Sequence, residues 1–114
     1  MYYYKSKGDV DSIIHLGLKY PSFIDDNIAS ELIEFICKHG KTKAHFKQAE
    51  VWNKSVMKKS INFKLAKYQS KICYKLSDII ESKKWAQIAI KIAKYEGIQL
   101  SNNDELIKII NSSL

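Results

Sequence analysis

The chain has 114 residues, a length that corresponds to one domain with one hydrophobic core. Hydrophobic residues make up 46% and charged residues 27%, which excludes a disordered chain, a collagen-like repeat and a disulfide-dense scaffold. The formal net charge is +7, and lysine supplies all 19 of the Lys and Arg positions. This bias indicates an AT-rich genome, such as that of a microbe, phage or plasmid, but codon bias does not explain the surplus of positive charge.

The spacing of apolar residues predicts an all-α fold, because they recur every three or four positions and glycine and proline total only five residues. Residues 1–8 are expected to form a flexible N-terminal arm. A first helix should follow at 9–19 and stop before the only proline. A second helix should begin after Asp25 or Asp26 and end at Gly40, which follows a basic last turn.

The segment 42–81 contains no glycine or proline, so its composition permits one continuous helix. The apolar stripe argues against this, because its first half points about 110° away from its second half around a straight helix. The first half consists of Phe46, Ala49, Asn53, Val56 and Met57, and the second of Ile61, Leu65, Tyr68, Ile72 and Leu76. We therefore expect this long central segment to be kinked or broken near 60–62, giving helices at 42–59 and 61–80.

The helix at 61–80 is expected to lie at the centre of the bundle. It carries a second side of mostly small residues, which permits the close approach of a neighbouring helix: Phe63, Ala66, Ser70, Cys73 and Ser77. Only its sector with lysines at 64, 67, 71 and 75 must face water. This distribution is typical of the central helix of a compact bundle, so we expect residues 1–114 to form a single domain of five to six helices.

Two further helices are expected after the central one. Ser82 is a candidate N-cap for the first, and Gly97 is a candidate C-cap. Its inward residues should be Trp85, Ile88, Ala89 and Ile92, and those of the last helix Leu106, Ile109 and Ile110. Residues 101–104 resemble a capping box. Residues 92–98 resemble part of a helix-turn-helix motif, but the acidic start of the next helix favours an ordinary corner between two helices.

The positive charge is concentrated in one part of the sequence. Residues 1–40 carry four lysines and six acids, and residues 76–114 carry five of each. Residues 41–75 carry ten lysines and a single acid, Glu50. A lysine face is often only a solvated face, but an ordinary solvated helix mixes both signs. The near absence of acids therefore favours a surface that attracts polyanions.

The first hypothesis for function is a small non-enzymatic protein that binds DNA or RNA in an accessory or regulatory role. Lysines would contact phosphates, and Trp52, Tyr74 or the tyrosines at 2–4 would stack on bases. Because lysine lacks the bidentate fork of arginine, backbone contact is expected rather than sequence-specific readout. The alternative is a protein-interaction module, of inhibitor or immunity type, that covers an acidic partner. The candidate nucleic-acid-binding residues are Lys47, Lys54, Lys58, Lys64, Lys67, Lys71, Lys75 and Trp52.

The residue pattern predicts no catalytic, cofactor or metal site. Acidic pairs lie at helix starts, where capping explains them, and glycines are too few for a phosphate-binding loop. Cys37, His39 and His45 flank one turn, but a fourth metal ligand is missing. Cys37 and Cys73 are expected to be reduced, buried thiols, with a single disulfide as the alternative.

Membrane and secretion signals are not expected either. The first residues lack the apolar core of a signal peptide, and no apolar run approaches the ~20 residues that cross a bilayer. The sequence therefore predicts a cytoplasmic protein without a membrane partner.

Overall fold

The computed structural model describes residues 9–101 and 104–112, so the expected N-terminal arm at 1–8 lies outside the described residues. Within those ranges the chain forms six α-helices and no strand. The helices are α2 (Val10–Lys19), α3 (Asp26–His39), α4 (Lys43–Met57), α5 (Phe63–Lys75), α6 (Ile79–Glu96) and α7 (Glu105–Asn111), with a 3-10 turn η1 (Pro21–Phe23) after α2. The prediction of an all-α bundle of five to six helices is confirmed.

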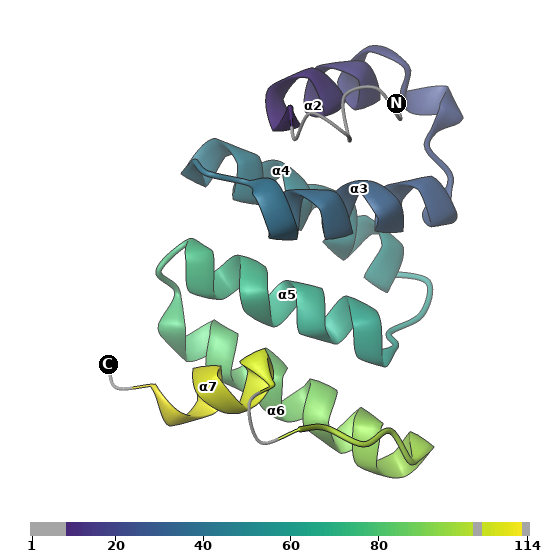
Figure 1. Ribbon diagram of the computed structural model, residues 1–114. Coiled ribbons are helices and arrows are strands. Elements are labelled where there is room, and N and C mark those ends of the chain that lie inside the picture. Colours follow the sequence, from purple (N-terminus) through teal and green to yellow (C-terminus); the bar gives the residue numbers. More distant parts are fainter. Residues whose placement is uncertain (1–8, 102–103, 113–114) are drawn as a thin grey trace.

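The helices are stacked side by side with α5 in the middle (Figure 1). In this view α3 and α7 lie in front, α4 lies behind α3, and α6 lies behind α7. α5 contacts α3, α4, α6 and α7, and its most extensive contact is with α6. α5 is therefore the central helix of the bundle, as expected for this part of the sequence. Its rotation about its own axis determines which of its lysines reach the surface.

Each α-helix begins at a polar residue whose side chain accepts a hydrogen bond from a backbone N–H of the first turn. These N-caps are Asp9, Asp25, Thr42, Asn62, Asp78 and Asp104. Such a cap satisfies a donor that the helix leaves unpaired, and it contributes about 1 kcal/mol. Asp25 is one of the two residues after which the second helix was expected to begin. The capping box expected at 101–104 is not formed, because the last helix begins only after Asp104.

The start of α4 uses His45 as part of its cap. Thr42 Oγ1 accepts from His45 N–H at 3.2 Å, while His45 Nδ1 accepts from the N–H of Lys41 at 3.1 Å. Because Nδ1 accepts, the proton of the neutral ring lies on Nε2, which donates to Asp11 at 2.7 Å. The buried His45 side chain therefore joins α4 to α2.

The break near 60–62 is confirmed. α4 ends at Met57, residues 58–62 connect the helices, and Asn62 caps α5 by accepting from Leu65 N–H at 2.9 Å. All five stripe residues expected for α4 are buried, Asn53 included. In α5 the stripe is buried at Leu65, Tyr68 and Ile72, whereas Ile61 is exposed because it lies before the helix begins.

The expectation that α5 continues to residue 80 and that Ser82 caps α6 was wrong. α5 ends at Lys75, and Ser77 adopts the left-handed conformation with φ of 65°. Asp78 N–H then donates to Cys73 O at 2.9 Å and Ser77 N–H to Tyr74 O at 3.1 Å, a pairing that satisfies carbonyls at the helix end. Glycine usually occupies this position, but residue 77 is a serine, so the sequence did not indicate a turn here.

Replacing Ser77 by glycine should stabilise the protein by about 0.5 to 1 kcal/mol, because glycine adopts the left-handed conformation without a steric penalty. The free energy of unfolding in urea measures this effect. Gly97 adopts the same left-handed conformation, with φ of 73°, at the end of α6. The reverse kind of change, Gly97→Ala, should therefore destabilise the protein by about 1 kcal/mol. A Ser77→Gly variant less stable than the parent would contradict the turn described here.

Small residues bring α5 and α6 close together, as expected from the second side of α5. Ser70 Oγ donates to Ser82 O and Ser82 Oγ donates to Ser70 O, both at 2.7 Å. On α6 the fully buried row is Ser82, Ala86, Ala89 and Ala93. The expected inward residues Trp85, Ile88 and Ile92 are only half-buried, because the small side chains face α5 instead.

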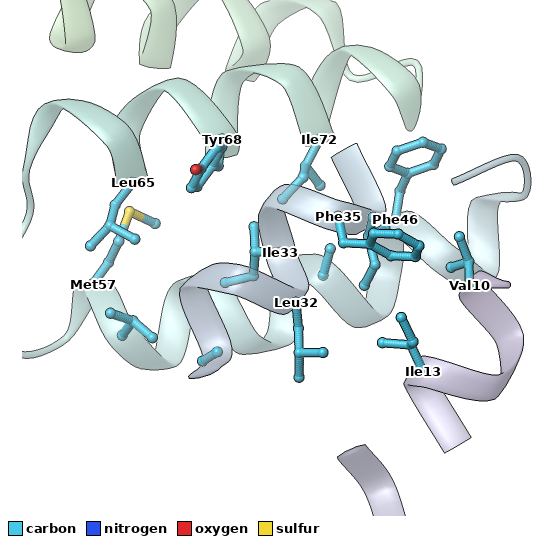
Figure 2. Packing of buried hydrophobic residues seen from close by; sticks show 14 residues of the cluster. Val10, Ile13, Leu32, Ile33, Phe35, Phe46, Met57, Leu65, Tyr68 and Ile72 are labelled. Carbon is cyan, nitrogen blue, oxygen red and sulfur yellow. The ribbon is translucent and has the colours of Figure 1, made fainter. Parts of the chain in front are cut away.

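Among the described residues the hydrophobic core consists of two clusters. The larger cluster joins α2, α3, α4 and α5, and Figure 2 shows Phe46 beside Val10 and Met57 beside Leu65. The smaller cluster joins α5, α6 and α7 through Ala66, Ala86, Ala89, Leu106 and Ile109. Leu106 and Ile109 are buried as expected, so α7 is anchored over α5 and α6 by its apolar side.

Candidate nucleic-acid interface

Four exposed lysines form a row along α4, which we name the α4 row. It consists of Lys43, Lys47, Lys54 and Lys58. At 100° per residue these four side chains lie within about 60° of one another, on the side opposite the buried residues of α4. The row is about 22 Å long, since it spans fifteen residues at 1.5 Å each. It includes three of the predicted binding residues.

The α4 row has little negative charge to neutralise it. Lys54 Nζ lies 3.8 Å from Glu50, and no acid in the described part of the chain pairs with Lys43, Lys47 or Lys58. Glu50 is itself turned toward the helix interface, where it accepts from Gln69 Nε2 at 2.9 Å. A field of one sign therefore remains over the exposed side of α4.

A buried polar network fixes α4 against α5 beneath this row. Asn53 Nδ2 donates to Leu65 O and to Gln69 Oε1, each at 3.1 Å. Asn53 and Gln69 are almost fully buried, and Gln69 donates onward to Glu50. The hydrogen bonds donated by these buried amide groups fix the relative position of the two helices and hence the direction of the row, while Asn53 Oδ1 has no partner among the described residues.

The predicted lysines of α5 do not share a surface with the α4 row. α5 faces α4 through Leu65 and Gln69, and its lysines lie about 135° around the helix from those residues. We name this second set the α5 row; it consists of Lys64, Lys67, Lys71 and Lys75. The basic region 41–75 thus forms two surfaces on different sides of the bundle.

The α5 row is partly neutralised by acids from elsewhere in the chain. Lys67 Nζ lies 3.4 Å from Asp104 and Lys71 Nζ lies 3.1 Å from Glu105, both at the start of α7. The side chains of Lys67 and Lys71 are only 25% and 18% exposed. Lys59 likewise pairs with Asp26 at 3.3 Å. A count of charges along the sequence misses these pairs, because the partners are more than thirty residues apart.

Trp52 lies away from both lysine rows. It is half-buried between α2 and α4, where a Cβ atom on Gly17 would come within 2.9 Å of its ring. This position is about 150° around α4 from the middle of the α4 row. Tyr74 is 42% exposed beside Lys71 and Lys75, and the tyrosines at 2–4 lie outside the described residues. No aromatic side chain of the described residues therefore joins the α4 row.

The remaining titratable groups favour structure over reactivity. Cys37 and Cys73 are free thiols, and burial raises the pKa of each to about 11, so both remain protonated at neutral pH. Partial burial alone would raise the pKa of Glu34, but hydrogen bonds from Lys38 and Tyr68 lower it. Tyr68 Oη donates to Glu34 at 3.1 Å, and burial followed by this charge raises the pKa of the phenol.

Comparison with known proteins adds no functional information. No family model, no curated protein and no solved structure matches the chain. None of the described helices combines the length and the apolar character needed to cross a bilayer. The functional argument therefore depends on the charged surfaces.

Proposed function

We propose that the protein binds the phosphate backbone of nucleic acid through the α4 row. The main observation that supports this proposal is the row itself, which consists of four exposed lysines along one side of a helix. The one nearby acid, Glu50, is turned toward the helix interface by its hydrogen bond with Gln69. Lysine ammonium groups bind phosphates as point charges and release condensed counterions. The protein then holds a backbone without reading base sequence.

The dimensions of the α4 row suit a backbone. Phosphates of one DNA strand rise by about 3.4 Å each along the helix axis while winding around it, so a straight row of about 22 Å meets only the phosphates that face it, on one or both strands. Four lysines then neutralise about four phosphates. The rigid position of α4, set by its buried amide network with α5, presents these charges without a large ordering cost.

Duplex affinity should fall steeply with salt. Four phosphate contacts correspond to a slope of about −3.6 for log K against log salt, or about 150-fold between 50 and 200 mM salt. Fluorescence anisotropy with a labelled duplex of about 24 base pairs measures the slope, and two unrelated sequences should give similar affinities. If no salt-sensitive binding to DNA or RNA is found at 50 mM salt, the proposal fails.

A further inference from the structure

Two neighbouring hollows lie along α5, one lined by residues of α3, α5 and α7 and the other by residues of α5 and α7; α3 and α7 are the helices in front in Figure 1. We name the two hollows together the α3–α5–α7 groove. One half is lined by residues that include Glu34, Cys37, Lys38, Lys64, Lys67 and Lys71. The other half is lined by Lys71, Tyr74, Lys75, Glu105, Lys108 and Ile109. Lys71 and Glu105 line both halves, so the two halves meet at this ion pair.

The groove has an excess of positive charge. Its lysines are Lys38, Lys64, Lys67, Lys71, Lys75 and Lys108, and the carboxylates that reach them are Glu34, Asp104 and Glu105. Within the described residues, each of these acids pairs with one lysine. Lys64, Lys75 and Lys108 form no ion pair there, so the groove as a whole complements an anion.

The depth of the groove selects against a duplex. Lys67 and Lys71 are only 25% and 18% exposed, since α3 and α7 rise on either side of them. A nucleic-acid duplex is stiff and does not enter a gap beside a single helix. An extended polypeptide is much thinner, and its carboxylate side chains reach recessed ammonium groups.

The spacing of the lysines fits such a polypeptide. Lys67, Lys71 and Lys75 follow one another at four residues, or about 6 Å along α5. In an extended chain, side chains on one face repeat every second residue, at about 6.6 Å. We propose that the α3–α5–α7 groove binds an extended segment of a partner protein that carries acidic side chains at alternate positions.

The α7 carboxylates show how such a ligand is held. Asp104 and Glu105 already place carboxylates on Lys67 and Lys71, at 3.4 and 3.1 Å. A lysine ammonium has three donors, so it accommodates a second carboxylate or exchanges one for another. Glu105 is 58% exposed and gives way more readily than Asp104, which also caps α7. Glu105 therefore competes with the ligand for Lys71.

The test uses two labelled eight-residue peptides of identical composition. One has glutamate at every second position, and the other has its four glutamates adjacent. Anisotropy at 50 mM salt should show at least fivefold tighter binding of the alternating peptide. Lys71→Gln with Lys75→Gln should weaken its binding about 10-fold or more, since two charge-assisted contacts are lost. The matched pair Lys54→Gln with Lys58→Gln, on the α4 row, should change it less than twofold.

Glu105→Gln is a further variant, which should strengthen rather than weaken peptide binding and which leaves all lysines in place. It should tighten binding of the alternating peptide about threefold, because a competing carboxylate is removed. Equal binding of the two peptides, equal loss in the two lysine pairs, or tighter binding of a single-stranded oligonucleotide in this groove would overturn the proposal. Duplex binding is measured on the same variants, so failure of the groove and failure of the α4 row are separate results.

Discussion

Replacing Lys47, Lys54 and Lys58 by glutamine should weaken duplex binding about 100-fold at 50 mM salt. Each glutamine removes one phosphate contact, so the salt slope should also fall by about one per substitution. The three side chains are exposed, and the one ion pair among them, Lys54 with Glu50, is long at 3.8 Å, so helicity and the melting temperature should remain close to those of the parent. Anisotropy titrations and circular dichroism measure both effects.

The matched control removes the same charge from the other side of the bundle. Lys64, Lys75 and Lys108 are exposed, line the α3–α5–α7 groove, and form no ion pair among the described residues. Changing these three to glutamine should weaken duplex binding less than about fivefold, through the lower net charge alone. Equal losses in the two triple variants would mean that only net charge matters and that the α4 row is not the contact.

Replacing Ala86 by leucine should destabilise the fold by about 3 kcal/mol. Ala86 is fully buried, in the cluster that joins α5, α6 and α7. Three added carbon atoms would force α6 away from α5 and strain the paired hydroxyl contacts of Ser70 and Ser82, because a packed core has no space for them. The melting temperature should fall by more than about 10 °C.

Ala44 is the control for this substitution, because it is an exposed alanine on α4. Ala44→Leu should change the free energy of unfolding by less than about 0.5 kcal/mol. If Ala86→Leu were as stable as Ala44→Leu, the close contact of α5 and α6 described here would be wrong.

The helices and most of their ends could be predicted from the sequence, because those signals are local. Caps such as Asp25 and the shifted apolar stripe around residues 60–62 each act within a few residues. The turn at Ser77 was not predictable in the same way. Serine is an unusual residue for the left-handed conformation, and the close packing of α6 on α5 is what requires the chain to turn there.

The number of lysines in residues 41–75 pointed to the candidate interface, but it did not show how these lysines are grouped in space. Whether Lys67 and Lys71 are free depends on α7, which returns Asp104 and Glu105 to α5 from more than thirty residues away. Helical spacing also placed Trp52 on α4 without revealing that Gly17 leaves room for its ring. Tertiary packing therefore separates one basic region into an exposed row and a recessed groove.

Lysine acetylation followed by mass spectrometry, with and without a saturating duplex, tests the α4 row most directly. The account predicts that the duplex slows acetylation of Lys47, Lys54 and Lys58 at least fivefold. Lys64 and Lys75, on the other side of the bundle, should react at unchanged rates. Uniform protection of all five lysines, or protection of Lys64 and Lys75 alone, would contradict the account.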